Sequence, residues 1–209
     1  MRLGAKTVVI SPEDPIGLPM GGYGDRKEPC SGVADDLTAT VFYVKINGEE
    51  IYLITMDLIG LSSSVLNPYR AKFSEILNIP FENIVISCTH SHSTFESIGL
   101  LGRGIVPGIV TSRLRTRVLN QMMRKVLRSM IETKNPKAVR QVKMGFEKLS
   151  IEGSAINRRH PSRPIDPKLT VVKFVDAKKP RNIVAVLLNL GVHCTLLGGK
   201  NTLLSGDWA

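Results

Sequence analysis

The order of apolar and polar positions predicts a chain in which strands alternate with helices. Residues 38–46 and 50–56 have strand character and flank Asn47-Gly48, the dipeptide most typical of a tight β-hairpin. Shorter β-branched or apolar runs predict further strands at residues 7–10, 83–88, 139–146, 169–175 and 182–189. The pattern therefore predicts an α/β fold, with α+β as the alternative, built on a mixed β-sheet layered with helices.

Two segments have helical periodicity, residues 67–77 and, after a glycine-rich loop, residues 112–133, where Asn135-Pro136 ends the pattern. In the second segment apolar residues recur at steps of three and four, which predicts a face packed on a core: Leu114, Val118, Leu119, Met122, Val126 and Met130. The intervening cations predict a solvated basic face: Arg113, Arg115, Arg117, Arg124, Lys125 and Arg128.

Composition is that of a folded globular protein. The chain has 209 residues, of which 43% are hydrophobic and 22% charged, so a self-supporting core is expected and disorder is not. No linker-like tract divides it, and we treat residues 1–209 as one unit without an internal boundary. The net charge of +10 raises nucleic acid as a partner, but no nucleic-acid-binding motif accompanies it, and we expect no nucleic acid.

The cysteines and apolar runs bear on location. Three cysteines, Cys30, Cys88 and Cys194, are too few and odd in number for a disulfide scaffold. The N-terminus has no apolar core of a signal peptide, and the most apolar stretch, residues 183–197, is interrupted and shorter than a membrane span. We expect a reduced, cytoplasmic protein without a transmembrane segment.

Polar residues follow three of the predicted strands. Asp57 follows residues 50–56, Thr89-His90-Ser91-His92-Ser93 follows residues 83–88, and His193 follows residues 182–189. Sites in α/β folds gather at the carboxyl ends of strands, and in extended backbone His90 and His92 would point to the same side. Because imidazole is a common zinc ligand, we predict a metal site in which His90 and His193 bind the ion and His92 acts on substrate.

Simpler interpretations stay open for these residues. Each histidine can be an ordinary polar residue at a strand end, and Asp57 a cap or turn acceptor. Cys88 and Cys194 flank the histidines and offer thiolates, although burial as small hydrophobic residues is the more ordinary use. The glycine-rich segment 17–24 lacks the spacing of a phosphate-binding loop, and its glycines are expected to allow close backbone approach or positive φ.

An ordered series of motifs resembles the N-terminal part of neutral/alkaline (non-lysosomal) ceramidases. The series comprises Met20-Gly21-Gly22-Tyr23-Gly24, Met56-Asp57-Leu58, Ser87-Cys88-Thr89-His90-Ser91-His92-Ser93, Ile156-Asn157-Arg158, and Val192-His193 followed by Leu204-Ser205-Gly206-Asp207. The resemblance implies a zinc-dependent amidase that hydrolyses an N-acyl lipid such as ceramide. It implies that His90 and His193 bind zinc and that His92 and Arg158 line the active site, with Asp57 and Asp207 as possible supporting residues. From the sequence alone, Arg158 also fits a solvated basic loop.

The chain departs from the family pattern in two places. Ser93-Thr94-Phe95 stands where the family usually has Ser-Gly-Pro, and the family's remaining zinc ligands, a Glu and a Tyr, come from beyond the Ser-Gly-Asp motif. We therefore expect the first part of a catalytic domain, whose incomplete sheet favours self-association. The alternatives to a zinc amidohydrolase are a non-catalytic truncated or interaction protein and, less favoured, a basic nucleic-acid-binding protein.

Overall fold

The structure, a computed structural model, describes residues 1–98 and 107–209, with the side chains of the second helix described from residue 115 onward. Part of the expected glycine-rich loop before that helix, and the side chains of Arg113 and Leu114, lie outside the described residues. The elements follow in the order β1 (Arg2–Val9), β2 (Gly32–Val33), β3 (Thr38–Ile46), β4 (Glu49–Met56), α1 (Ser63–Leu77), the 3-10 turn η1 (Phe81–Asn83), β5 (Ile84–Cys88), α2 (Pro107–Lys134), β6 (Arg140–Ser150), β7 (Lys168–Asp176), β8 (Ile183–Leu190) and β9 (Leu203–Leu204).

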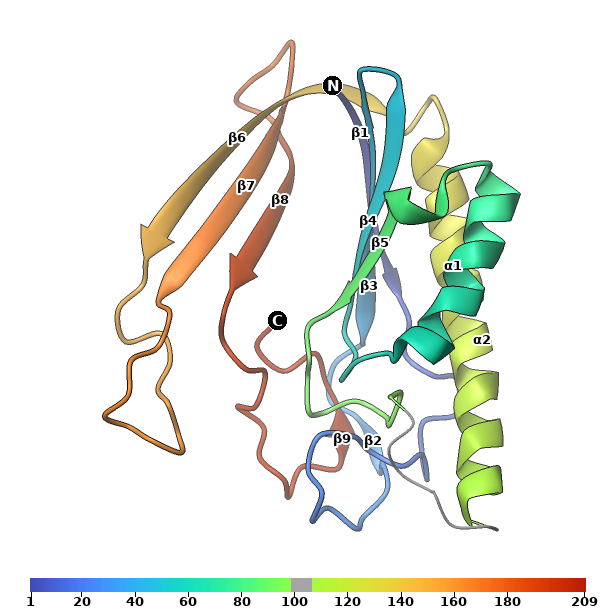
Figure 1. Ribbon diagram of the computed structural model, residues 1–209, viewed down its shortest axis with the longest axis vertical. Helices are drawn as coiled ribbons and strands as arrows, with labels where there is room; N and C mark the ends of the chain where they lie inside the picture. Colours follow the sequence, from blue (N-terminus) through green and yellow to red (C-terminus); the bar gives the residue numbers. More distant parts are fainter. Residues whose placement is uncertain (99–106) are drawn as a thin grey trace.

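A mixed seven-stranded sheet organises the fold, in the order β5-β4-β3-β1-β6-β7-β8. Strands β4 and β5 are parallel and the other neighbours antiparallel, which confirms the predicted α/β architecture. Only two residue pairs join β1 to β6. Figure 1 shows β6 crossing the start of β1 and leading into a second panel, formed by β6, β7 and β8. The strands β4, β5 and β8 all end at the same end of the molecule.

Alternation along β3 and β4 separates two hydrophobic clusters. Val41 and Tyr43 point to the side that α1 and α2 cover, where they pack with Phe73 and Val126. Phe42 points to the other side and packs in a smaller cluster with residues of β1, β6 and β7: Leu3, Val142 and Phe174. The larger cluster anchors the helices, and the smaller one joins the two panels of the sheet.

The β-hairpin prediction is confirmed in register and turn chemistry. Strand β3 pairs with β4 from Ala39↔Met56 to Ile46↔Glu49, and the turn places Asn47 at φ 51° and Gly48 at φ 89°. Both values lie in the left-handed region that such a two-residue turn requires. The strands predicted at residues 169–175 and 182–189 are present as β7 and β8, which pair antiparallel.

Helix α1 begins earlier than predicted. Asn67-Pro68 was expected at its start, but the helix begins at Ser63 and contains Pro68. Val65 and Leu66 pack against the main core, and this burial favours helix in the first turn although Pro68 lacks an N–H donor. Helix α2, from Pro107, is also longer than predicted, with proline at its first position.

Other boundaries were wrong for identifiable reasons. Strand β1 begins at Arg2 rather than Thr7, because it pairs with β3 along its whole length even through Gly4 and two cations. Strand β6 extends to Ser150 since its pairing with β7 continues that far. The two-residue parallel pair of β2 and β9 was not predicted at all.

Helix α2 confirms the predicted division into core and solvated faces. The apolar side chains expected from the periodicity are buried, namely Val118, Leu119, Met122, Val126 and Met130, and Met123, Ser129 and Thr133 are buried with them. Arg117, Arg124 and Arg128 are exposed as predicted, whereas Arg115 and Lys125 are half-buried and Arg115 pairs with Glu96. None of the described helices combines the length and apolarity needed to cross a membrane. The second sheet panel exposes apolar side chains, among them Phe146 and Leu188, and self-association stays a prediction.

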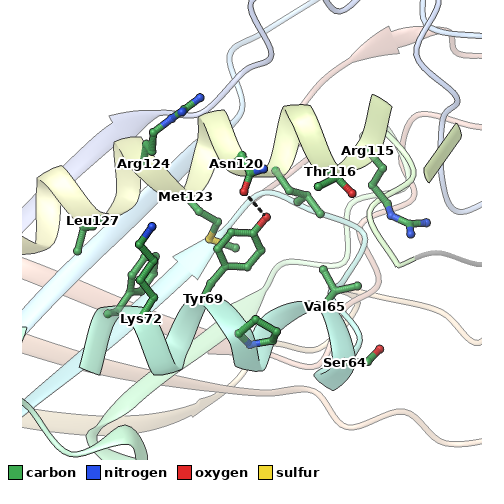
Figure 2. Close-up of a pocket in the computed structure, with 13 residues that line it drawn as sticks. Ser64, Val65, Tyr69, Lys72, Arg115, Thr116, Asn120, Met123, Arg124 and Leu127 are labelled. Atoms are coloured by element: carbon green, nitrogen blue, oxygen red, sulfur yellow. Dashed lines mark hydrogen bonds between the residues drawn. The ribbon is translucent and has the colours of Figure 1, made fainter. Parts of the chain in front are cut away.

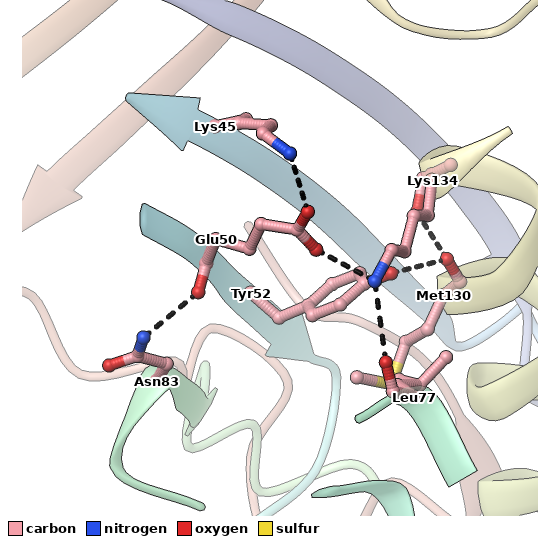
Figure 3. A network of polar contacts seen from close by, with 8 residues as sticks. Lys45, Glu50, Tyr52, Leu77, Asn83, Met130 and Lys134 are labelled. Atoms are coloured by element: carbon pink, nitrogen blue, oxygen red, sulfur yellow. Dashed lines mark hydrogen bonds and ion pairs between the residues drawn. The ribbon is translucent and has the colours of Figure 1, made fainter. Parts of the chain in front are cut away.

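A polar network surrounds Glu50, at the end of the molecule opposite the carboxyl ends of β4, β5 and β8 (Figure 3). The Glu50 carboxylate accepts from Lys45 (2.8 Å) and Lys134 (2.7 Å), and Lys134 also donates to the carbonyl of Leu77. The Asn83 amide donates to the Glu50 carbonyl. The network therefore ties the β-hairpin, both helix C-termini and the start of β5 together. Burial alone would raise the pKa of Glu50, but hydrogen bonds from Lys134 and Lys45 outweigh it and lower the pKa to about 2.

We expect Glu50→Gln to destabilise the fold by about 2 kcal/mol at pH 7, because Lys134 loses its carboxylate partner. A depressed folded pKa stabilises the protein above the ordinary value of 4.5 and ceases to do so as pH falls towards about 2. Urea unfolding at pH 7, 4 and 2.5 measures this, and the difference between wild type and variant should shrink in acid. The exposed Glu49→Gln on the same hairpin is the control and should be close to neutral. An equal loss in both variants, or one independent of pH, contradicts the assignment.

Candidate metal centre

His90 occupies a left-handed turn directly after β5. The N–H groups of Thr89 and His90 donate to the carbonyls of Met56 and Leu58, which extends the pairing with β4 beyond Cys88. His90 then adopts φ 62°, and its Nδ1 lies at hydrogen-bond distance from the carbonyl of Ile59. A carbonyl only accepts, so Nδ1 carries a proton, and Nε2 is the ring nitrogen left to bind a metal.

His92 is the buried member of the group, with 5% of its surface exposed. Its N–H donates to the carbonyl of Cys194 (3.1 Å), and its own carbonyl accepts from Arg26 Nη1 (3.0 Å). The ring lies edge-on to Tyr23, with centroids 4.9 Å apart. Gly22, at φ 94°, lies so close that a Cβ there would be 2.4 Å from His92 Cγ. The ring is thus held by backbone on one side and by an aromatic ring on another.

His193 arrives from the chain that follows β8 and completes the cluster. Its Nε2 lies 2.8 Å from Nε2 of His92, and its ring stacks on that of His90 with centroids 4.9 Å apart. One ligand atom from each of the three histidines lies within 4.8 Å of the others. The expected convergence is confirmed, but its route was wrong: His90 and His92 meet through the left-handed turn at His90 rather than through extended backbone.

The electrostatic setting favours the neutral form of His92 and His193. Burial, followed by the neighbouring imidazoles and the positive charges of Arg158 and Arg26, lowers the pKa of His92 to about 4. Burial first, then His90 and Arg158, also lowers the pKa of His193, while Asp207 acts in the opposite direction. Neutral imidazole is the form that binds transition metals, so the donor set fits zinc.

The two predicted supporting acids hold loops rather than join the histidines. Buried Asp57 accepts from the N–H and hydroxyl of Thr38, both at 2.8 Å. Asp207 accepts from the N–H groups of Leu196 and Leu197, each at 3.0 Å, and so fixes the turn just after His193. Their carboxylates are therefore committed to backbone donors, and neither belongs to the described cluster of possible metal ligands.

Arg158 lies in the exposed loop between β6 and β7, close enough for its charge to act on His92 and His193. Its predicted role in lining the site stays a prediction. Cys88 and Cys194 stay outside the described histidine cluster. Burial and the nearby carboxylates raise the pKa of Cys88 to about 12 and of Cys194 to about 11, which disfavours the thiolate.

Sequence reasoning did not single out Arg26 and Tyr23 as site residues. Arg26 donates to the carbonyls of Gly21, His92 and Gly199, and its guanidinium lies over the Tyr23 ring. The Tyr23 hydroxyl donates to the carbonyl of Leu197. Together they join the glycine-rich segment to both histidine loops. The glycine-rich segment was nevertheless expected to allow close backbone approach. Gly22 confirms this expectation, because it lies against the His92 ring.

Comparison with known proteins agrees with this geometry. Residues 13–209 match the family model described as neutral/alkaline non-lysosomal ceramidase, N-terminal. A solved structure described as a ceramidase complexed with C2 superposes with TM-score 0.81 at 18% identity, covering 98% of this chain and 33% of that one. Neutral ceramidase from Pseudomonas aeruginosa gives TM-score 0.80 at 19% identity, covering 98% and 34%. The chain thus spans about a third of the length of these structures, and at such identities they show the fold alone. No curated protein sequence matches the chain.

We expect Gly22→Ala to displace the His92 ring and to destabilise the protein by about 1–3 kcal/mol, because a methyl group collides with the ring and φ is positive. The matched control is Gly24→Ala two residues away, where a Cβ meets nothing within 4 Å. Thermal unfolding and the NMR shifts of the histidine rings measure the effect. Similar behaviour of the two variants would show that the His92 ring does not depend on this close approach.

Proposed function

Because this chain belongs to the neutral/alkaline non-lysosomal ceramidase family, we propose that it carries the histidine centre of a zinc-dependent amidohydrolase acting on N-acyl lipids. The observation that supports this most directly is the convergence of His90, His92 and His193 from two loops about a hundred residues apart in the chain. Family membership supports a hydrolase, and one of the similar solved structures is a ceramidase complexed with C2. Zinc and the acyl amide substrate are part of the proposal.

In this proposal His90 and His193 hold the ion and His92 faces the reacting group. The free Nε2 of His90 and the stacked ring of His193 supply two imidazoles from opposite loops. Zinc, when bound, polarises the amide carbonyl and activates water for attack at neutral pH. Further ligands are expected from parts of such an enzyme that this chain does not span, as it covers about a third of its structural neighbours.

The chain's own residues would orient the amide and stabilise negative charge. His92 is fixed by Tyr23, Gly22 and two backbone hydrogen bonds, so its ring offers a nitrogen at a defined position. Arg158 contributes positive charge from the loop between β6 and β7. Charge developing on the carbonyl oxygen is stabilised by such pre-positioned groups, because they need no reorganisation during the reaction.

The first test measures zinc per chain after gentle purification and after loading with zinc. We expect close to one zinc in the wild type and a loss of at least about tenfold in affinity for His90→Ala with His193→Ala, since both imidazoles are removed. His160→Ala is the matched control, as the fourth histidine lies in an exposed loop outside the cluster. Equal zinc in all three proteins would contradict the assignment. Zinc in none would favour a non-catalytic role for this chain by itself.

The second test separates holding zinc from acting on substrate. We expect His92→Gln to retain zinc but to lower kcat for a fluorogenic N-acyl amide by about 100-fold or more, the usual size of a lost proton-transfer or oxyanion group. Activity and zinc content are measured on the same samples of the zinc-loaded protein. A variant that loses its zinc would make His92 a ligand, and one that keeps full activity would remove it from the reaction.

A further inference from the structure

A groove lies between α1 and α2 and is lined by side chains of both helices (Figure 2). Its volume is about 660 Å³, within the range of small-molecule sites. The floor is apolar, because Phe73, Leu119 and Met123 lie at its base with at most 2% of their surface exposed. Val65 and Pro68 of α1 and Leu127 of α2 continue the apolar surface along its walls.

The charges around this groove are of one sign. Lys72, Arg115 and Arg124 line it, and its thirteen lining residues include no Asp or Glu. Arg115 pairs with Glu96 at 3.5 Å. Lys72 and Arg124 make no ion pair within the described residues, and Figure 2 shows them at one end of the groove with Arg115 at the other. At that end Lys72 points from α1 towards α2, whereas the Arg124 guanidinium extends away from α1 and would have to swing over the groove to share a ligand with Lys72.

The neutral polar groups inside the groove already have partners. The Tyr69 hydroxyl donates to Asn120 Oδ1 at 2.9 Å, a contact drawn across the groove in Figure 2. A ligand is thus not required to satisfy this hydroxyl. An apolar ligand that carries a negative charge would complement both the apolar floor and the cations Lys72 and Arg124.

We propose that the groove binds a long-chain carboxylate, with the part of the acyl chain next to the carboxylate on the apolar floor and the carboxylate beside Lys72 and within reach of Arg124. Charge complementarity favours this occupant over a neutral lipid, and Val65 to Lys72 provides about 10 Å of groove along α1 at the helical rise of about 1.5 Å per residue. The site stands without the proposed amidase activity, although hydrolysis of an N-acyl lipid releases a molecule of this class.

The experiment titrates the protein with three ligands of equal chain length: oleate, oleyl alcohol and oleylamine, below their aggregation concentrations. Displacement of a fluorescent fatty acid gives each affinity. We expect oleate to bind about tenfold more tightly than oleyl alcohol, because exposed ion contacts add only modestly to affinity. Lys72→Glu with Arg124→Glu should lower oleate affinity about tenfold or more and make oleylamine the preferred ligand.

Arg128→Glu with Lys137→Glu is the control, because it makes the same change of net charge outside the groove. It should leave oleate binding nearly unchanged, as should His90→Ala with His193→Ala, so a failed zinc site and a failed groove are told apart. Equal affinity for oleate and oleyl alcohol, or equal losses in both charge-reversed pairs, overturns the proposal. Oleate binding that needs the histidines moves the ligand to their site. If the wild type forms dimers and does not bind oleate, and only Lys72→Glu with Arg124→Glu dissociates them, the occupant of the groove is a second copy of the chain and the proposal is overturned.

Discussion

The histidine centre depends on a short set of backbone hydrogen bonds that join two loops about a hundred residues apart. The N–H of His92 donates to Cys194, and the N–H of Ser205 donates to Ser93 at 2.8 Å. The Ser91 hydroxyl adds a bond to the carbonyl of Ser205, and the serines involved are almost fully buried. Such buried bonds tolerate little displacement, because a lost partner leaves a desolvated polar group. The loops after β5 and β8 are therefore held together as one unit, and this unit fixes the relative positions of the imidazoles.

The aspartates near the carboxyl ends of the strands stabilise the backbone of these two loops and of the segments beside them. Asp57 fixes Thr38 beside the end of β4, Asp35 accepts from the N–H of Gly206, and Asp207 closes the turn after His193. Each carboxylate accepts hydrogen bonds from backbone N–H groups that would otherwise be unpaired. The three carboxylates thus order the backbone around the cluster, and the three imidazoles face one another.

Features set by neighbouring residues could be predicted from the sequence, whereas features set by packing between distant segments could not. Asn47-Gly48 specified its hairpin because the turn needs positive φ at both positions, whatever the surroundings. The histidines could be grouped because polar residues after buried strands gather at one end of a fold. The turn at His90, the start of α1 at Ser63 and the pairing of β2 with β9 could not be predicted, since each is stabilised by residues far away in the chain. Arg26 was missed for the same reason: its partners are carbonyls of three separate segments.

The charge around the histidines suits a site where negative charge develops. Burial first, then the neighbouring imidazoles and the charges of Arg158 and Arg26, lower the pKa of His92 to about 4, so its ring is neutral at physiological pH. The same positive field opposes a bound cation, which makes the number and geometry of its ligands decisive for affinity. For a carbonyl oxygen that gains negative charge, however, the field is favourable without any movement of the protein. For the proposed zinc amidohydrolase, the positive field would therefore favour charge development on the substrate and would make a complete set of zinc ligands necessary.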